Sequence, residues 1–525
     1  MCKTLMLLEV SQKQRYIFSS KKLADNARRS DEIAYVTSPD FFQKAAPELY
    51  RDDDLVYAGG GHTVLCFEDS TTASKFAQRV SESVLRQYPG MELFVKQLPY
   101  DETMTPNENL SALTAAAEKK KSFRTSAFAQ TTFGVEKLDP SSHAPVFEGQ
   151  EAVCSADPVI DPPLGWLFPT KLEDLAGGND EEKKSKDKDS KKDNFIAVIH
   201  IDGNAMGKRV ERFYGTFTGA DRWDSFRTAA QRFSEGIQAD FEAAFREMVD
   251  ELLGDAALLE KLDVRKPTLP LRPVILAGDD VCFVTAGSIA LDCARVFLDK
   301  LSARVNQADG EGYAACAGIA LVHTKYPFHQ AYDLAEELCS RAKKFGASID
   351  PNGGVCAMDW HIEFGQLKDG LDALRRDFET EDGNRLELRP IAVRVPEGID
   401  AAAQTGGVRT YGFFRGMCRA MQGERGKTAR GKIKELRTAF KQGEVESSFF
   451  LHSKEIRDLL YHGIEAEFGS EERIEEYRRI LYGEKSGFDL EPFRRINGEA
   501  FKRCLFFDAI EMVDHCEFFN EEVSE

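Results

Sequence analysis

The strongest constraint on the fold is a pair of apolar segments joined by a glycine-containing turn, which occurs twice in the chain. The first copy is VYAGGGHTVLCF at residues 56–67, and the second is VILAGDDVCFV at residues 274–284. Apolar arms of this length around a glycine turn predict β-hairpins. Each hairpin is therefore expected to lie at the centre of a unit whose other elements flank it in the sequence.

The segments around the two hairpins follow the same order. The first unit has a strand at 5–10, a helical run from Gln12, the hairpin, a helix at 72–88 and a strand at 92–98. The second has a strand at 195–202, a long amphipathic helix, the hairpin, a helix at 289–305, a strand at 314–323 and a helix ending at 335–346. The apolar stripe of the long helix consists of Phe226, Phe233, Ile237, Phe241, Phe245, Met248 and Leu252. Each unit reads β-α-β-β-α-β, so we predict an α+β fold with two ferredoxin-like units.

The remaining segments suggest a linker and a helical domain. Residues 177–194, GGNDEEKKSKDKDSKKDN, contain no apolar residue and are expected to be disordered. From about residue 366 the strand signals end, and five helical patterns follow, within 365–378, 412–423, 428–443, 453–469 and 475–483. The predicted domains are a first unit at 1–100, an insert with the linker at 101–193, a second unit at 194–365 and a helical domain at 366–525.

The composition limits the function and the compartment. The net charge of −19 argues against a general nucleic-acid coat, because neutralising phosphates needs a basic surface. No apolar run approaches the roughly 18 residues of a membrane span, and the apolar stretch at 5–10 is too short for a signal peptide. Eleven cysteines without a C-x-x-C pair fit free thiols and no zinc site. We therefore expect a cytoplasmic protein that does not use a membrane.

Three aspartates of the second unit form a candidate metal site. Asp202 ends an apolar strand, and Asp279 and Asp280 occupy the tip of the hairpin. In this fold order the two strands are neighbours, so the carboxylates should face one another. With the backbone carbonyl of Ile201 they form a hard-oxygen set suited to Mg²⁺ or Mn²⁺, and two such ions support nucleotidyl transfer. The alternative is that Asp279 and Asp280 are only turn residues.

Glycines and lysines near these aspartates are candidate nucleotide contacts. The turn that includes Gly203, Asn204 and Gly207 can direct backbone N–H groups at phosphates, or it can be purely structural. Gly278 permits the hairpin turn. Lys343 and its neighbour in the last helix can bind a triphosphate, or they can complement the helix dipole.

The first unit lacks the acidic pair. Its hairpin tip aligns Gly59, Gly60, Gly61 and His62 with the AGDD turn, and Glu9 takes the place of Asp202 without acidic partners. We therefore expect no catalytic metal there, and a second nucleotide bound between the units. The candidate contacts are Gly60, Gly61, His62, Ser19 and Ser20. For each of these residues the alternative is an ordinary turn or cap residue.

The chain resembles the large polymerase-like subunit of type III CRISPR effector complexes, the cyclic oligoadenylate synthase with two palm domains. The first-palm likeness lies in QKQRYIFSSKKL (12–23) and YAGGGHTVL (57–65). The second-palm likeness lies in HIDGNAMGK (200–208), LAGDDVCFV (276–284) and residues 317–346, and RPIAVRV (389–395) resembles the start of the family's last domain. The resemblance implies synthesis of oligoadenylates from two ATP molecules held between the palms, with Mg²⁺ or Mn²⁺. It makes Asp202, Asp279 and Asp280 metal ligands and Lys343 a triphosphate contact, and it implies guide RNA, target RNA and other effector subunits as partners.

The chain also departs from that family. Ala277 stands where the family turn has its first glycine, and residues 101–193 contain a lone cysteine, Cys154, instead of a zinc module. The HD nuclease domain of many members is not seen, so we expect no DNase activity, and the chain is expected to be a divergent or stand-alone relative. The basic run at 425–441 is either an RNA or acidic-protein contact or a solvated helix face. Two alternatives to the synthase remain open, namely a dinucleotide cyclase on the same palm and a non-catalytic nucleotide-binding scaffold of an RNA-guided complex.

Overall fold

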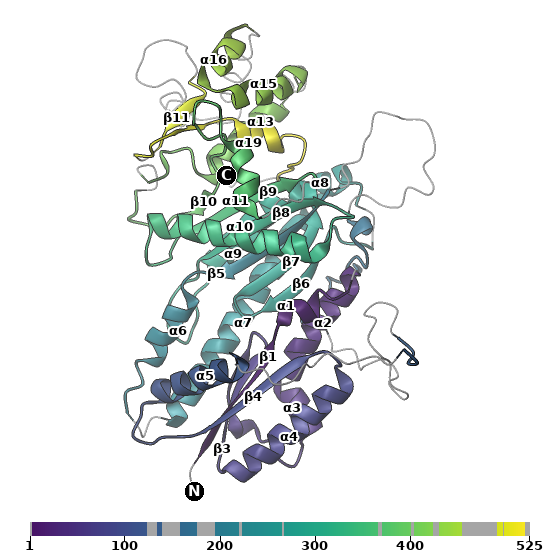
Figure 1. The fold of residues 1–525 in the computed structure, drawn as a ribbon, viewed down its shortest axis with the longest axis vertical. Coiled ribbons are helices and arrows are strands. Elements are labelled where there is room, and N and C mark those ends of the chain that lie inside the picture. The colour runs from purple at the N-terminus through teal and green to yellow at the C-terminus, as the bar shows by residue number, and fades with distance from the viewer. Residues whose placement is uncertain are drawn as a thin grey trace.

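The structure is a computed structural model that describes most of the chain. The described residues are 3–20, 22–122, 134–138, 158–175, 195–219, 223–264, 267–365, 370–400, 404–423, 430–453, 491–496 and 498–519. The predicted linker at 177–194 and the predicted helices at 453–469 and 475–483 lie essentially outside them. Figure 1 shows two sheets along the long axis, with the helices of the C-terminal part beyond the second sheet.

The first unit is a four-stranded antiparallel sheet in the order β2-β3-β1-β4. Its elements are β1 (Thr4–Ser11), α1 (Lys13–Ile17), α2 (Leu23–Val36), α3 (Pro39–Ala45), β2 (Leu55–Gly59), β3 (His62–Phe67), α4 (Ser70–Gln87) and β4 (Glu92–Pro99), with α5 (Pro106–Ser122) following. This is the ferredoxin-like order predicted from the sequence. Asp69 caps α4 by accepting from the backbone N–H groups of Thr71 and Thr72, which explains where that helix begins.

The second unit has the same four-strand core and two further strands. Its sheet runs β10-β9-β8-β5-β7-β6, with β9 parallel to β8. Its elements are β5 (Phe195–Gly203), α6 (Met206–Tyr214), α7 (Trp223–Gly254), α8 (Ala256–Lys261), β6 (Leu271–Ala277), β7 (Asp280–Ala286), α9 (Ala290–Ser302), β8 (Ala315–His323), α10 (Phe328–Ile349), β9 (Cys356–Glu363) and β10 (Ile391–Arg394). The predicted α+β class with two ferredoxin-like units is confirmed.

Strands β9 and β10 were not predicted, and β10 comes from the segment that was expected to be helical. Strand β9 has the sequence CAMDWHIE, and all of its residues are buried. Its polar residues Asp359, His361 and Glu363 interrupt the apolar run that would mark a buried strand. Asp359 is neutralised by Arg375, whose Nη2 lies 2.7 Å from Asp359 Oδ1, so a tertiary contact stabilises a residue that the local pattern disfavours.

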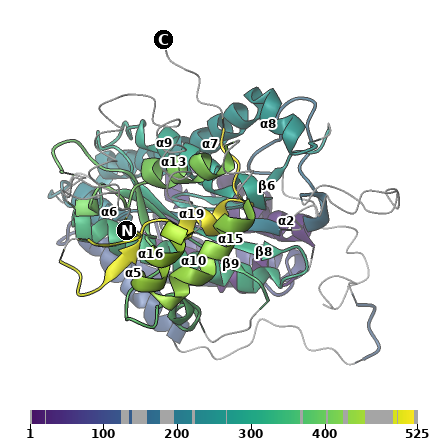
Figure 2. The ribbon, with the colours of Figure 1, turned by 90° about the horizontal axis from the view of Figure 1, so that it is seen from above.

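The C-terminal part is mainly helical among its described residues. It contains α11 (Leu371–Arg375), α13 (Tyr411–Gln422), α15 (Arg430–Gln442), α16 (Glu444–Ser453), β11 (Phe493–Arg495), β12 (Lys502–Cys504) and α19 (Phe507–Met512). Figure 1 shows α13, α15, α16 and α19 together at the top of the molecule, and Figure 2 looks down on that end. Within the predicted basic run, Lys434 pairs with Asp514 and Arg437 pairs with Glu511. Part of that run is therefore engaged inside the chain.

A buried arginine, Arg389, joins the second sheet to the C-terminal part. Its side chain is fully buried and lies 2.6 Å from Glu511 and 3.6 Å from Asp508. Its guanidinium also lies over the Trp360 ring of β9, 5.1 Å from the ring centroid. The backbone N–H of Arg389 donates to Asp508 Oδ2 at 3.0 Å. One side chain thus neutralises two buried acids, which is favourable only while all of the partners are present.

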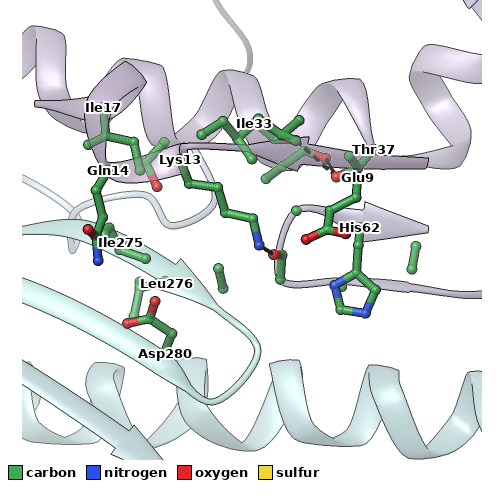
Figure 3. A pocket seen from close by; sticks show the side chains of 18 of the residues that line it. Glu9, Lys13, Gln14, Ile17, Ile33, Thr37, His62, Ile275, Leu276 and Asp280 are labelled. Carbon is green, nitrogen blue, oxygen red and sulfur yellow. Dashed lines mark hydrogen bonds between the residues drawn. The ribbon is translucent and has the colours of Figure 1, made fainter. Parts of the chain in front are cut away.

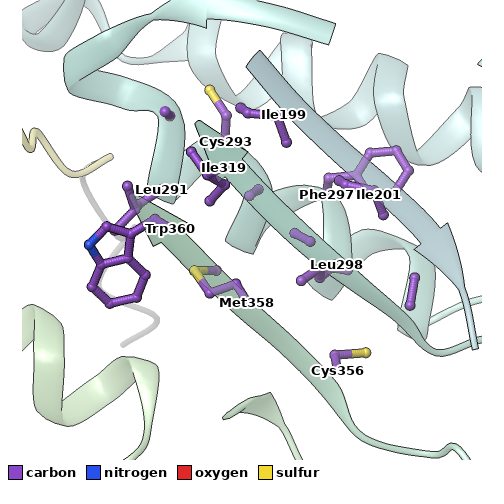
Figure 4. Packing of buried hydrophobic residues seen from close by; sticks show 14 of the residues in the cluster. Ile199, Ile201, Leu291, Cys293, Phe297, Leu298, Ile319, Cys356, Met358 and Trp360 are labelled. Carbon is purple, nitrogen blue, oxygen red and sulfur yellow. The ribbon is translucent and has the colours of Figure 1, made fainter. Parts of the chain in front are cut away.

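The two faces of β5 belong to different cores. Ala197, Ile199 and Ile201 pack toward α7 and α9 (Figure 4), whereas Ile196 and Val198 pack toward α10 and residues of the first unit. Because side chains alternate along a strand, His200 and Asp202 share the second face. Gly318 of β8 lets α10 approach this face closely, since a Cβ there would lie 1.9 Å from the carbonyl oxygen of Ala335.

Helix α7 holds the hairpins of both units. Ser234 Oγ donates to the carbonyl of Ala58 in β2 at 2.9 Å. Gln238 Nε2 donates to the carbonyl of Leu276 at 3.1 Å, and its Oε1 accepts from the N–H of Gly278 at 2.6 Å. The long amphipathic helix is therefore both a core element of the second unit and the direct link to the first.

Two further findings concern membrane-spanning helices and the state of the cysteines. Among the described helices, none combines the length and the apolar character that a membrane span requires. The described cysteines are all buried and unpaired, as the sequence predicted for free thiols.

Candidate active site

The register of the second sheet brings the three aspartates together. Asp202 of β5 lies directly opposite Asp280 of β7, which places their Cβ atoms on one face at about 5 Å. The N–H of Gly203 donates to the carbonyl of Asp279 at 3.2 Å. A Cβ on Gly203 would lie 3.0 Å from Asp279 Cβ, so glycine at this position allows the turn to pack against the end of β5. The predicted convergence of these carboxylates is therefore seen in the fold.

The turn itself needs glycine at one position and tolerates alanine at another. Gly278 has a φ of +68°, a conformation that L side chains rarely adopt. Ala277 is not among the residues with positive φ, and it pairs with Asp280 at the end of the hairpin. The methyl group that distinguishes this turn from two successive glycines is thus accommodated without backbone strain.

The site concentrates negative charge in poorly solvated surroundings. Burial, followed by the charge of Asp202, raises the pKa of Asp279 to about 6 and that of Asp280 to about 7. The Asp280 side chain is 46% exposed, since it faces a cavity, but protein surrounds its other sides. No described group donates a hydrogen bond to Asp280 Oδ1, and His200 Nδ1 lies 3.5 Å from that oxygen. Burial lowers the pKa of His200, so its ring is a poor counter-charge.

A lysine from α10 partly neutralises this cluster. Lys343 Nζ lies 2.5 Å from Asp202 Oδ2 and 2.8 Å from the carbonyl oxygen of Gly203. Lys344 is exposed on another side of the helix. Of the two lysines singled out in the sequence, Lys343 reaches the aspartates.

The donor set fits a hard divalent cation, although the side chains would have to move to bind one. Ile201, whose carbonyl was predicted as a ligand, lies in β5 between Val281 and Ala317 with its side chain fully buried. As they stand, no three His, Cys, Asp or Glu side chains of the described residues are grouped closely enough to hold a metal. Three carboxylates that repel one another, with one orphaned buried oxygen, are nevertheless the chemistry that Mg²⁺ or Mn²⁺ stabilises. Binding would require Lys343 to release Asp202 Oδ2.

A cavity of about 920 Å³ lies between the two units beside the aspartates. Figure 3 shows Glu9, Lys13 and His62 from the first unit on one side and Asp280 with Leu276 on the other. The hairpin tips also meet here, because a Cβ on Gly60 would lie 3.8 Å from the carbonyl oxygen of Ala277. The cavity is large enough for nucleotide-sized ligands, which typically occupy roughly 300–1,000 Å³.

The two hairpins are structurally equivalent, as the sequence alignment of their tips predicted. Glu9 of β1 lies opposite His62 of β3, just as Asp202 lies opposite Asp280. Gly60, Gly61 and His62 line the cavity. Burial and the nearby charge of Lys13 lower the pKa of His62 to about 4, so this imidazole is neutral at physiological pH.

Other predicted contacts have local structural roles. Ser19 Oγ donates to the carbonyl of Tyr16 and Ser20 Oγ donates to Asp25, and neither serine lines the cavity. The structure therefore favours the alternative reading of the serines as turn or cap residues. Asn204 Nδ2 donates to the carbonyls of Gly353 and Val355, which ties its loop to the start of β9.

Gly207 lies in the first turn of α6 and faces open space. It follows Ala205, which has a left-handed φ of +53° and starts the helix without a side-chain cap. The N-cap residue thus supplies no side-chain acceptor to the first N–H groups of α6, and the glycine turn as a phosphate contact stays a prediction.

Several residues of the site were not predicted. His200 could have been found from its position two residues before Asp202 on the same strand. Gln238 lies one helical turn after Ser234 on α7, but its contact with Gly278 depends on tertiary packing. Lys13 reaches the cavity from α1, and its neighbour Gln14 donates from Nε2 to Glu336 Oε1 of α10 at 3.2 Å across the two units.

This combination of sheet order, facing hairpins and strand-end carboxylates defines a palm domain, the fold used by nucleotide polymerases and cyclases. Residues 195–348 match the family model "Cas10/Cmr2, second palm domain". The second palm of this chain is accordingly Cas10-like, which confirms the resemblance inferred from the sequence.

Solved structures show the same fold at low sequence identity. A Csm1 chain from a Csm1-Csm4 cassette in complex with AMPPNP aligns with a TM-score of 0.51 and 14% identity, covering 98% of this chain and 69% of that chain. Csm1 of T. onnurineus aligns with a TM-score of 0.49 and 14% identity over 85% of this chain and 63% of that chain. The first cassette structures are matched over about half of their own length. Among curated proteins, no sequence matches this chain.

The raised pKa values predict a stability that depends on pH. An Asp280 pKa of about 7, against an ordinary value of 3.8, means that the folded protein binds more protons than the unfolded chain between these pH values. Stability therefore falls as pH rises from about 4 to about 7. We expect Asp280→Asn to raise the melting temperature relative to wild type at pH 8 and to leave it nearly unchanged at pH 4. Thermal unfolding with EDTA at both pH values measures this, and an equal shift at both would contradict it.

Proposed function

We propose that this chain is a metal-dependent nucleotidyltransferase that makes cyclic oligoadenylate-type second messengers from ATP in type III-like CRISPR defence. The observation that carries the proposal is the meeting of Asp202, Asp279 and Asp280 at the wall of a cavity shared by both palms. The family match of residues 195–348 supports the same chemistry. A structure of the same fold was solved with AMPPNP, which agrees with a nucleotide ligand for this fold.

The residues of the chain have distinct tasks in this reaction. Bound divalent ions would supply activation of a ribose hydroxyl and stabilisation of the leaving pyrophosphate. Asp202, Asp279 and Asp280 would hold those ions, and Lys343, released from Asp202, would contact the triphosphate of the donor nucleotide. Gln238 holds the turn through Gly278 and so keeps the aspartates in position. The first palm, which has Glu9 and His62 in place of the acidic pair, would bind the nucleotide that provides the attacking hydroxyl.

The reaction product tests this proposal. Purified protein is incubated with ATP and either Mg²⁺ or Mn²⁺, and the products are identified by mass spectrometry, with GTP, CTP and UTP in parallel and EDTA as the control. We expect oligoadenylates that require metal. A cyclic dinucleotide as the sole product would instead identify a dinucleotide cyclase. Nucleotide binding without any product, under all four nucleotides and with or without co-purified RNA, would identify a scaffold.

The proposed partners follow from the same comparison. The solved relatives are Csm1 chains in Csm1-Csm4 cassettes, one of them described as a subcomplex of a type III-A interference complex. We propose that this chain also assembles with further effector subunits and with guide and target RNA. Co-purification with RNA and a second subunit from the native host would support the assembly, and an RNA-free monodisperse protein would support a stand-alone enzyme.

A further inference from the structure

Lys13 enters the cavity from the first palm at a position that the backbone makes available. It is the first residue of α1 and follows Gln12, which has a left-handed φ of 51° although it is not glycine. Its ammonium donates to the carbonyl of Gly60 at the tip of the first hairpin (Figure 3). A Cβ on Gly61 would lie 3.0 Å from Lys13 Cε and 3.3 Å from Nζ, so the glycine turn makes room for this side chain.

The charge of Lys13 has no carboxylate partner within ion-pairing distance among the described residues. The acid closest in sequence, Glu9, accepts from Lys121 Nζ at 2.9 Å instead, and Lys121 also bonds Glu118 at 2.5 Å. Burial lowers the pKa of Lys13, while the more distant charges of Glu9, Asp280 and Asp279 partly offset that effect. A half-buried ammonium bound to one neutral carbonyl retains donors and an uncompensated charge, which an anion in the cavity would satisfy.

Each palm has a lysine near the three aspartates, and of these two Lys13 lines the cavity, as does Lys121, which pairs with Glu9 and Glu118. Lys343 belongs to the second palm and lies against Asp202. Lys13 belongs to the first palm and lies against Gly60, across the cavity from the Asp279–Asp280 turn. Two separate cations near one group of aspartates, one from each palm, suit two nucleotides with separate phosphate groups.

We propose that Lys13 is a positioning residue that binds the 5′-phosphates of the nucleotide seated on the first palm, the one whose 3′-hydroxyl attacks. This inference rests on the proposed function for the identity of the ligand. Because Lys13 is anchored at the first hairpin, holding those phosphates fixes the nucleotide relative to the turn that carries Asp279 and Asp280. A charge-assisted contact of this kind contributes roughly 10- to 150-fold in affinity.

The test compares ligands with and without phosphates. Isothermal titration measures binding of a non-hydrolysable ATP analogue and of adenosine, both with Mg²⁺, to wild type, Lys13→Gln, Lys13→Arg and the control Lys44→Gln, whose lysine is exposed on α3. We expect Lys13→Gln to weaken binding of the analogue by about tenfold or more and to leave adenosine binding unchanged. Lys13→Arg should stay within about threefold of wild type, because it keeps the charge, and Lys44→Gln should bind as wild type does.

Two outcomes would overturn the inference. One is unchanged binding of the analogue by Lys13→Gln, and the other is an equal loss for adenosine, which would show that Lys13 only holds the hairpin. In product assays the expected change is a higher KM for ATP with kcat nearly unchanged. If wild type makes no product but Lys13→Gln still loses analogue binding, the proposed function fails and the phosphate contact stands. If wild type makes product and Lys13→Gln binds the analogue normally, the proposed function stands and the phosphate contact of Lys13 fails.

Discussion

Replacing Asp279 and Asp280 together with asparagine is expected to reduce product formation from ATP by at least about a thousandfold. Asparagine keeps the size of each side chain but removes the charge that would hold divalent ions. Both carboxyl groups have raised pKa values, so their charged forms destabilise the fold, and the amides should not unfold it. Product is measured by mass spectrometry, and folding of the variant by its melting temperature.

A matched control separates catalysis from general effects of charge. Asp333 lies exposed on α10, the helix that carries Lys343, and does not line the cavity. Asp333→Asn should make product at the wild-type rate. A double variant at the turn that still makes oligoadenylates at a similar rate would show that these carboxylates do not carry the chemistry.

Replacing Arg389 with methionine is expected to destabilise the protein by about 3–5 kcal/mol. Arg389 is fully buried and pairs with Glu511 at 2.6 Å and Asp508 at 3.6 Å. Its loss leaves Asp508 buried without that cation and Glu511 with only its longer pair to Arg437, at 3.4 Å. Burial already raises the pKa of Asp508, and Arg389 opposes that shift. Denaturant unfolding followed by intrinsic fluorescence would measure the change, since Trp360 lies against Arg389.

The control for this variant is an ion pair at the surface. Lys434 lies 2.7 Å from Asp514, and its side chain is 59% exposed. Lys434→Met should cost less than about 1 kcal/mol, because solvent screens exposed pairs. Similar losses for Arg389→Met and Lys434→Met would mean that the buried cluster does not depend on its arginine.

The sequence alone predicted those elements whose local residue pattern agrees with the fold. The segments 56–67 and 274–284 each have two apolar arms around a glycine turn, and both form hairpins as predicted. The facing of Asp202 and Asp280 follows from strand order alone, because the first and third strands of this fold are neighbours. The pairing of Glu9 with His62 repeats that register in the first palm.

The remainder depends on contacts that no local pattern encodes. Strand β9 contains two buried acids, of which Asp359 is paired with Arg375 of the C-terminal part, so the sequence of this strand does not look like that of a buried strand. Ser19 and Ser20 were plausible nucleotide contacts because they are polar. Their hydroxyls instead donate to the Tyr16 carbonyl and to Asp25, which lie nearby in the sequence. Lys13 reaches the cavity because of the unusual backbone of Gln12 and the space beside Gly61, neither of which is visible in the residue types.

The contacts of α7 have a geometric consequence. Ser234 and Gln238 are four residues apart, so the points at which α7 holds the two hairpins are separated by about 6 Å along its axis. The spacing of the two hairpins is therefore set by the rise of one helix. Lengthening α7 by a residue between these positions would rotate one anchor by about 100° relative to the other and turn the two hairpin tips away from each other.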